Sequence, residues 1–208
     1  MSDDNKTKQR YDRIAPIYDK FEIIMEKAAF QGWRKKLWDK IEENSKEYDK
    51  LLEAGVGTGK NIPYYPEGIN YTAIDFSPKM LSRAKEKASD SVRKIEFREM
   101  DIQKLEFTDD FFDFIVTSCV FCSVPDPVKG LRELKRVLKP NGKVYMLEHL
   151  RSQKFLLGPI MDLTNFIPKN IWGANINRRT LENIETAGLN VESVEDLWLD
   201  IVKLIILS

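Results

Sequence analysis

The sequence predicts an α/β fold in which a mostly parallel sheet is covered by helices on both faces. Two observations lead to this prediction. From residue 50 onward, strand-like apolar runs alternate with helix-like segments, which is the order expected of parallel strands joined by crossover helices. The apolar run Lys50–Ala54 is also followed by three alternating glycines, Gly55, Gly57 and Gly59. This pattern is typical of a buried strand that is followed by a tight turn and the start of a helix.

Turn and capping signals delimit the elements that follow. Ser77 before Pro78 and Asp126 before Pro127 are good N-caps, and Gly188 is a good C-cap. Asn141-Gly142 predicts a turn. Helices are expected at residues 78–88, 127–138 and 180–187. Strands are expected at residues 50–54, 70–75, 94–99, 112–118, 143–148, 190–196 and 199–207.

The glycine loop predicts a ligand site at the carboxyl edge of this sheet, where open parallel sheets bind their ligands. A dinucleotide site needs the spacing Gly-x-Gly-x-x-Gly, but Lys60 stands where its third glycine would fall. The spacing therefore disfavours a nicotinamide oxidoreductase. The next strand ends in Asp75, and an acid at that point can bind both hydroxyls of a ribose.

Four motifs carry a family resemblance. They are Glu-Ala-Gly-Val-Gly-Thr-Gly from Glu53, Ile-Asp-Phe-Ser-Pro-Lys-Met-Leu from Ile74, Met-Asp-Ile from Met100 and Arg-Val-Leu-Lys-Pro-Asn-Gly from Arg136. As a set they resemble the class I S-adenosylmethionine-dependent methyltransferases over roughly residues 50–149. The resemblance implies a Rossmann-like sheet of seven strands with the last one antiparallel. It also implies S-adenosylmethionine as cofactor and S-adenosylhomocysteine as product.

In that family the glycine loop faces the methionine part of the donor, the acid after the second strand binds ribose, and the acid after the third meets the adenine amine. By position the two acids are Asp75 and Asp101. The resemblance thus implies a set of donor-binding residues, namely Glu53, Gly55, Gly57, Gly59, Asp75, Phe76, Met80, Asp101, Ile102, Ser118 and Cys119.

Residues 1–45 are expected to form an N-terminal helical lid. The segment Tyr11–Asp19 resembles that of ubiquinone/menaquinone-type methyltransferases and of bacterial phospholipid N-methyltransferases. In those relatives a tyrosine hydroxyl lies close to the reacting methyl, so Tyr18 is the catalytic candidate and Tyr11 a substrate-binding one. The alternative is that both rings only pack a helix onto the sheet. Farther along, Trp33 and Trp38 among basic residues suit either core packing or a membrane interface.

Residues 150–178 interrupt the alternation, and such a long connection in a compact domain is usually functional. The segment resembles the Glu-His-x-x-Ser and Asn-x-Asn-Arg elements of phospholipid and small-thiol methyltransferases, which places it over the acceptor site. Its apolar side chains could line a lipophilic pocket, touch a bilayer or form an ordinary capping subdomain. They are Phe155, Leu156, Leu157, Phe166, Ile167, Ile171 and Trp172.

Four residues near this segment are candidates for acceptor chemistry. His149, the single histidine of the chain, titrates near neutrality and is a catalytic candidate that positions or deprotonates the acceptor. It could equally be a hydrogen-bonded structural histidine. Arg151 and Arg178 could bind a phosphate bidentately, or form surface ion pairs, and Asn177 completes the substrate-binding candidates.

Composition narrows the remaining possibilities. The 208 residues predict one domain, with a cofactor-binding core at 50–149 and a C-terminal helix and strand pair at 179–208. Lys and Arg total 33, as do Asp and Glu, so no net field attracts nucleic acid.

Cys119 and Cys122 lack the further ligands of a zinc site, so no metal is expected. Reduced cysteines fit the cytoplasm, and a monomer or homodimer is expected.

The polar N-terminus lacks the apolar region of a signal peptide, and no apolar run reaches a membrane span. A cytoplasmic protein, peripheral at the inner membrane face at most, is therefore expected. Among acceptors, the amine of phosphatidylethanolamine-type phospholipids leads, followed by a quinone or a small thiol. A nucleic-acid methyltransferase is disfavoured, because Cys119-Val120-Phe121-Cys122 stands where an Asn/Asp-Pro-Pro-Tyr/Phe run would be. The alternative of another class is a non-catalytic donor-binding regulatory module.

Overall fold

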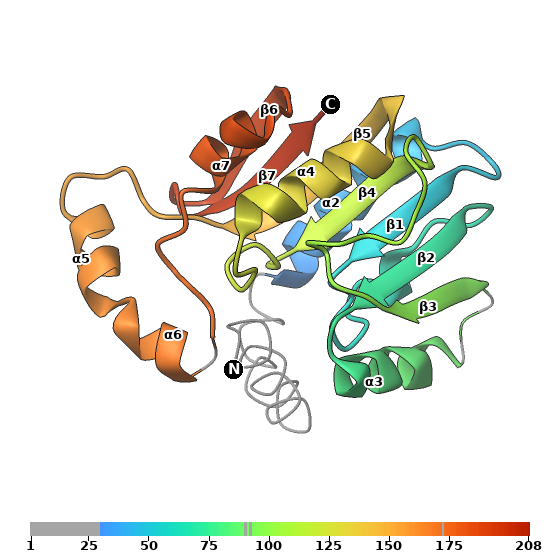
Figure 1. Cartoon of the computed structure of the whole chain (residues 1–208), viewed down its shortest axis with the longest axis horizontal. Helices are drawn as coiled ribbons and strands as arrows, with labels where there is room; N and C mark the ends of the chain where they lie inside the picture. The colour runs from blue at the N-terminus through green and yellow to red at the C-terminus, as the bar shows by residue number, and fades with distance from the viewer. Residues whose placement is uncertain (1–29, 90, 92, 172) are drawn as a thin grey trace.

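The computed structural model describes residues 30–89, 91, 93–171 and 173–208. This part of the chain contains a seven-stranded sheet of order β3-β2-β1-β4-β5-β7-β6 (Figure 1). The strands are β1 (Lys50–Ala54), β2 (Asn70–Asp75), β3 (Ile95–Glu99), β4 (Phe112–Ser118), β5 (Leu138–His149), β6 (Val191–Trp198) and β7 (Val202–Leu207). β1 to β5 pair in parallel, whereas β7 is antiparallel to both β5 and β6. The predicted Rossmann-like sheet, with its last strand antiparallel, is confirmed.

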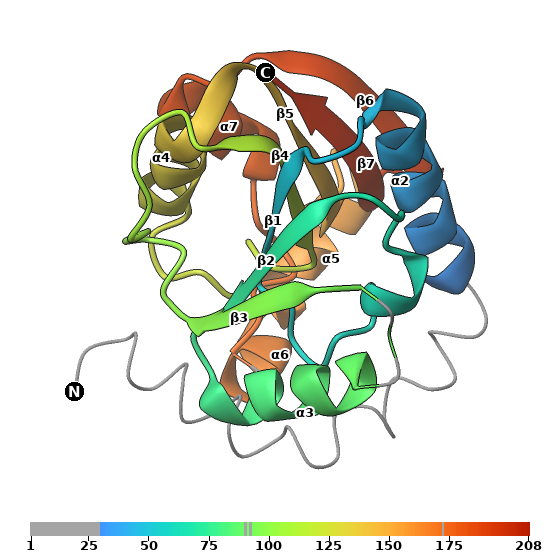
Figure 2. The same cartoon turned by 90° about the vertical axis from the view of Figure 1, so that its right-hand side faces the viewer.

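Helices cover both faces of the sheet, as predicted. α4 (Pro127–Val137) and α7 (Thr180–Ala187) bury their apolar residues against one face. α2 (Gln31–Asn44) and α3 (Pro78–Ala88) bury theirs against the other. Figure 2 shows the twisted sheet edge-on, with α4 and α7 on one side and α2 on the opposite side.

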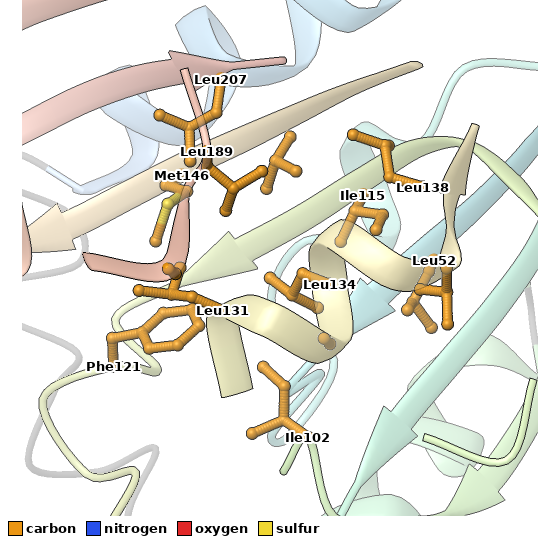
Figure 3. Close-up of a cluster of buried hydrophobic side chains, with 14 of the residues drawn as sticks. Leu52, Ile102, Ile115, Phe121, Leu131, Leu134, Leu138, Met146, Leu189 and Leu207 are labelled. Carbon is orange, nitrogen blue, oxygen red and sulfur yellow. The ribbon is translucent and has the colours of Figure 1, made fainter. Parts of the chain in front are cut away.

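The core on the α4 side joins residues that are distant in sequence. Leu52, Ile115 and Met146 from β1, β4 and β5 face Leu131 and Leu134 of α4 (Figure 3). All five are fully buried, and each such side chain contributes on the order of 2 kcal/mol of transfer free energy. This packing fixes the carboxyl ends of the central strands, where the site lies.

The predicted caps form as expected. The Ser77 hydroxyl accepts a hydrogen bond from Met80 N at 3.2 Å, and Asp126 Oδ1 accepts one from Lys129 N at 3.0 Å. Gly188 ends α7 in the left-handed conformation, with φ of 79°. N-caps of this kind stabilise a helix by about 1 kcal/mol, so local chemistry sets these boundaries.

The helix expected after the glycine loop is not an α-helix, and that expectation was wrong. The loop leads instead into a short 3-10 turn, η2 (Ile62–Tyr64). Pro66 is the physical reason, because a proline disfavours the helical conformation in the residue before it. Tyr65 accordingly has ψ of 125° and ends the turn.

β5 begins at Leu138 rather than at residue 143. Leu138 pairs with Phe112, but the next pair is Phe114 with Lys143, so the register shifts between them. The predicted Asn141-Gly142 turn thus becomes an irregularity inside the strand. A side chain at position 142 would place its Cβ 2.8 Å from the Asp113 carbonyl oxygen, which explains the glycine.

Of the two tryptophans of α2, Trp38 is buried in the core. Trp38 is 2% exposed and its ring lies 4.7 Å from that of Tyr65, centroid to centroid. Lys35 pairs with Asp39, and Lys36 with Glu195. The membrane-interface alternative is therefore wrong for Trp38.

The 150–178 segment forms an arm of two short helices, α5 (Leu157–Thr164) and α6 (Phe166–Ile171). In Figure 1 the arm extends beyond the sheet, on the side toward which β1 and β4 point. Met161 is buried against the α2 side of the core, while most other large apolar residues of the arm face outward. The exposed ones are Phe155, Leu156, Ile160, Leu163, Phe166 and Ile167. Among the described residues, no helix is both long and apolar enough to cross a membrane.

Candidate active site

A cavity lies at the carboxyl ends of β1, β2 and β4 and extends to the loop after β3. Adjacent parallel strands direct their following loops to the same edge, so side chains far apart in sequence meet there. With the exception of Gly59, every residue predicted to bind the donor lines this cavity. The cofactor side of the site therefore assembles where the motifs indicated.

The three glycines of the loop have different structural reasons, although all have positive φ. A Cβ at Gly55 would lie 2.5 Å from Val120 Cγ2, and one at Gly59 would lie 3.0 Å from Ala84 Cα. A Cβ at Gly57 would meet no heavy atom within 4 Å. Gly59 thus lets the loop pack on α3 instead of facing the donor, whereas Gly57 leaves the backbone open to the cavity.

Glu53 forms the floor of the cavity and is 1% exposed. Asn61 Nδ2 donates to its Oε1 at 2.6 Å, and the Tyr65 hydroxyl donates to its Oε2. Burial raises the pKa of Glu53 to about 7, although the hydrogen bonds from Tyr65 and Asn61 oppose the shift. The carboxyl group is consequently held in a fixed orientation whichever form it takes near neutral pH.

Arg34 and Asn61 extend this network, and the sequence analysis missed both. Arg34 Nη1 donates to Asn61 Oδ1 at 2.7 Å, and Asn61 Nδ2 also donates to Ser118 Oγ at 3.0 Å. Both residues line the cavity and are buried. The network thereby ties α2 and the glycine loop to the ends of β1 and β4.

Asp75 joins the glycine loop to the start of α3. Its Oδ2 accepts a hydrogen bond from Gly57 N at 2.9 Å, and its Oδ1 accepts one from Ser77 N at 2.9 Å. The side chain is 6% exposed and lines the cavity. These two bonds fix the orientation of the carboxylate at the cavity wall.

Asp101 is oriented by Gln103, a third residue that the sequence analysis missed. Gln103 N and Nε2 donate to Asp101 Oδ1 at 2.9 and 3.1 Å, and Gln103 Oε1 accepts from Asp126 N at 3.0 Å. The loop after β3 is thereby linked to the start of α4. Asp101, Ile102 and Gln103 form the wall at this end of the cavity.

Residues 119–125, here called the β4 loop, form the opposite wall. Cys119 has φ of 55°, an uncommon value for a residue with a side chain. Glu148, which is fully buried, holds the loop, because its Oε1 accepts from Val120 N at 3.1 Å and from Thr117 Oγ1 at 2.9 Å. Burial raises the pKa of Glu148 to about 7. Burial and the nearby Glu148 also raise the pKa of Cys122 to about 11, so Cys122 is a thiol rather than a thiolate.

The predicted acceptor-side residues lie outside the cavity lining. Arg151 Nη2 is 2.8 Å from Asp162 Oδ2, and Asn177 Nδ2 donates to Asp162 Oδ1 at 3.1 Å. Arg178 Nη2 donates to the Val124 carbonyl at 2.6 Å. Arg151 thus forms an ion pair, which was the alternative to phosphate binding. Arg178 binds the backbone of the β4 loop at Val124.

His149 ends β5 and is partly buried. Burial lowers its pKa, which favours the neutral imidazole near pH 7. It follows Tyr145 and Leu147 at alternate positions of the strand, and those two side chains pack on the α2 side of the sheet. His149 is not among the described residues that line the cavity. Tyr11 and Tyr18 lie outside the described residues.

The cavity fits an adenosyl donor. Asp75 and Asp101 stand beyond two neighbouring strands, at positions suited to a ribose and an adenine amine. The backbone at Gly57 has open space in front of it, so a ligand can approach it closely. The donor set therefore matches the chemistry that the motifs imply.

Comparison with known proteins agrees with this geometry. Residues 52–146 match the methyltransferase domain family. The chain is 32% identical over 164 residues to the ubiquinone/menaquinone biosynthesis C-methyltransferase UbiE of Bdellovibrio bacteriovorus, covering 77% of this chain and 68% of that protein. It is 37% identical over 113 residues to phosphatidylethanolamine N-methyltransferase of Cereibacter sphaeroides, covering 53% of this chain. That match spans only about half, 54%, of the relative.

Two further matches are a thiol methyltransferase that is similar in sequence and a cyclase that is similar in fold. Thiol S-methyltransferase TMT1B of Rattus norvegicus is 31% identical over 154 residues, with 70% of this chain and 62% of that protein covered. The crystal structure of the [4+2]-cyclase SpnF superposes with a TM-score of 0.73 at 22% identity, over 91% of this chain and 73% of that one. That superposition concerns the fold alone. Together with the motifs and the cavity, the sequence relatives establish that the chain belongs to the class I S-adenosylmethionine-dependent methyltransferases.

Proposed function

We propose that the protein transfers a methyl group from S-adenosylmethionine to a lipophilic acceptor, and that the leading acceptor is the amine of a phosphatidylethanolamine-type phospholipid. The observation that carries this proposal is the exposed apolar surface of the α5–α6 arm, in which Phe155 and Leu163 are 89% and 77% exposed. The likeness to a relative named phosphatidylethanolamine N-methyltransferase supports the choice of acceptor.

When bound, the donor would supply a methyl group on a sulfonium: the acceptor lone pair would bond to the methyl carbon, and the C–S bond would break with its electron pair left on sulfur, which departs as a neutral thioether. The protein must align the two groups and exclude water. Hydroxyl and carbonyl dipoles near the methyl suit a charge that disperses in the transition state. Ser118 and Cys119 lie on the cavity wall where such dipoles are needed, and we keep Tyr18 as the hydroxyl from the lid.

An amine acceptor must lose a proton to attack or after attacking, and His149 is our candidate to accept it. Its lowered pKa keeps the imidazole neutral near pH 7, which is the form that can take a proton. We expect His149→Gln to reduce turnover at least about tenfold while donor affinity is unchanged. Equal turnover of the variant and the parent protein would reject the role.

We propose that the arm contacts the lipid surface that holds the acceptor. Exposed apolar patches on soluble domains mark interaction sites, and the exposed Lys154 begins the arm. The double variant Phe155→Ser/Leu163→Ser should sediment less than the parent protein with vesicles that mix phosphatidylethanolamine with an anionic phospholipid. Val191→Ser is the matched control, because Val191 is 45% exposed on β6 and outside the arm. Equal loss of binding in the control would contradict the proposal.

An acceptor screen with labelled donor tests the activity itself. Phosphatidylethanolamine vesicles should become labelled faster than quinol precursors or alkyl thiols. Quinol or thiol labelling would favour the second candidate, which rests on the likenesses to UbiE and to the thiol S-methyltransferase. Donor binding without any labelled product would favour the regulatory module.

A further inference from the structure

The Asn-Ile-Asn-Arg motif at residues 175–178 lies between the α5–α6 arm and the β4 loop, and its side chains contact both. Asn177 Nδ2 donates to Asp162 Oδ1 of α5 at 3.1 Å. Arg178 Nη2 instead donates to the Val124 carbonyl of the β4 loop at 2.6 Å. The resemblance implied that these two residues bind the acceptor, but both contact groups of the protein itself. The motif thus connects two parts of the chain.

Asn175 holds the β4 loop with two hydrogen bonds. Its backbone N donates to the Cys122 carbonyl at 2.8 Å, and its side-chain Nδ2 donates to the same oxygen at 3.2 Å. A carbonyl oxygen has two lone pairs and can accept both bonds. Together, Asn175 and Arg178 therefore bind two carbonyls of the β4 loop, those of Cys122 and Val124.

These contacts matter because the β4 loop lies between β4 and α4 and contains no strand or helix of its own. A loop of this kind takes its shape from the partners of its backbone groups. Glu148 binds its first part through Val120 N, whereas Asn175 and Arg178 bind its later part. The loop residues that line the donor cavity come from both parts, and they are Cys119, Val120, Ser123, Val124 and Pro125.

Asn165, which lies between α5 and α6, continues the connection into the arm. Its Nδ2 donates to Asn175 Oδ1 at 3.2 Å, and its Oδ1 accepts a hydrogen bond from Ile176 N at 2.8 Å. The side-chain amide of Asn175 thus accepts from the arm at its oxygen and donates to the β4 loop at its nitrogen. Because an amide is planar and rigid, the positions of Asn165 and Cys122 depend on each other.

We propose that Asn175 and Arg178 are positioning residues, which fasten the arm to the β4 loop and so set the shape of the donor cavity. Neither is among the described residues that line the cavity, so both act on the donor through the loop. A surface or an acceptor that moves the arm would thereby change the affinity for the donor. The inference goes beyond the proposed function, because it holds for any acceptor.

Calorimetric titration with S-adenosylhomocysteine tests the proposal. Asn175→Ala removes the amide link and should weaken binding about 3- to 10-fold, the factor expected for one lost hydrogen bond. Asn177→Ala is the matched control, because it removes an identical side chain whose bond goes to Asp162. It should leave the affinity within about twofold. Unchanged affinity in Asn175→Ala, or equal weakening in the two variants, would overturn the proposal.

Thiol labelling reports on the loop without any ligand, because the two cysteines of the chain, Cys119 and Cys122, both belong to the β4 loop. Asn175→Ala should raise the rate at which N-ethylmaleimide labels Cys122 about 3- to 10-fold, whereas Asn177→Ala should not. Mass spectrometry after digestion separates the two thiols. Urea denaturation measures the free energy of unfolding, and faster labelling that a lower global stability fully explains would also count against the proposal.

Asn165→Ala extends the test to the arm, because the hydrogen bonds of Asn165 go to Asn175 and Ile176 rather than to the β4 loop. This variant should weaken S-adenosylhomocysteine binding about 2- to 5-fold. Combined with Asn175→Ala it should add little, since residues that act through one contact are not additive. No weakening, or fully additive losses, would contradict the proposed connection.

Circular dichroism checks the folding of each variant. If Asn175→Ala does not fold, Arg178→Met decides the question, because it removes the other bond to the loop and keeps a side chain of similar length. It should weaken S-adenosylhomocysteine binding about 3- to 10-fold, and an affinity equal to that of Asn177→Ala would reject the proposal.

Discussion

The cavity, or donor side, and the α5–α6 arm, which we propose as the acceptor side, are built differently. On the donor side, Glu53, Asp75 and Asp101 are each bonded to neighbouring groups. On the acceptor side, the α5–α6 arm turns large apolar side chains such as Phe155 outward. The contrast shows that short motifs can encode the donor side, but the acceptor side depends on surfaces that no single motif describes.

Glu148, which holds the β4 loop through Val120, should produce the largest change in the free energy of unfolding. Its pKa in the folded protein, about 7, lies above the ordinary value of 4.5. The stability linked to this group is therefore fully present below the unfolded-state pKa and is lost as the pH rises through the folded-state pKa. Over that window, the free energy of unfolding should fall by up to about 3 kcal/mol.

Urea denaturation of Glu148→Gln between about pH 5 and pH 8 checks this prediction. The variant should show a flatter dependence of unfolding free energy on pH than the parent protein. Some dependence should remain, because burial raises the pKa of Glu53 in the same direction. Parallel pH profiles for the two proteins would contradict the prediction, because they would mean that ionisation of Glu148 does not affect the free energy of unfolding.

Asp75 tests the donor side directly. Asp75→Ala removes the acceptor for Gly57 N and the carboxylate that we propose binds the ribose hydroxyls, and should weaken S-adenosylhomocysteine binding about 30-fold, or about 2 kcal/mol. Asp109→Ala serves as the control, because its side chain is 72% exposed and pairs with Arg136 away from the cavity. Isothermal calorimetry measures both. Similar affinities for the two variants would remove Asp75 from the donor site.

The difference between two glycines of one loop is the smallest effect compared and the most specific. Gly57→Ala should lower the stability by about 1 kcal/mol, because the residue has a positive φ. It should also weaken donor binding, because the added Cβ meets no protein atom and would occupy space at the wall of the donor cavity. Gly59→Ala should cost at least about 1 kcal/mol more, because its Cβ would crowd Ile62 and Ala84. Thermal denaturation and donor titration separate the two effects. The idea fails if Gly59→Ala is the variant with the greater loss of donor affinity.

Much of the fold could be predicted from the sequence because its signals are local. The bounds of β1 and β4, and the caps at Ser77, Asp126 and Gly188, follow from a few adjacent residues. The register shift near Leu138 could not be predicted in this way, because it depends on how β5 fits against β4. The 3-10 turn was missed because the helix signal of the glycine loop outweighed the restriction imposed by Pro66.

The same distinction applies to the site. The motifs placed Asp75 and Asp101 at the edge of the sheet where the cavity lies, whereas Arg34 and Asn61 are 27 positions apart and become partners only in the folded chain. Gln103 is two residues from Asp101, so its amide was a signal that could have been used. Arg151 and Arg178 illustrate the opposite case, because a basic side chain alone does not indicate whether it will bind a ligand or an internal partner.

The β4 loop is held from two directions. Glu148 binds Val120 from beneath, while Asn175 N donates to the Cys122 carbonyl at 2.8 Å and Arg178 donates to the Val124 carbonyl. The loop lines the donor cavity, and Asn175 and Arg178 belong to the 150–178 segment that forms the arm. Thermodynamic linkage makes any communication through this loop reciprocal. The factor by which an acceptor tightens donor binding must equal the factor by which the donor tightens acceptor binding.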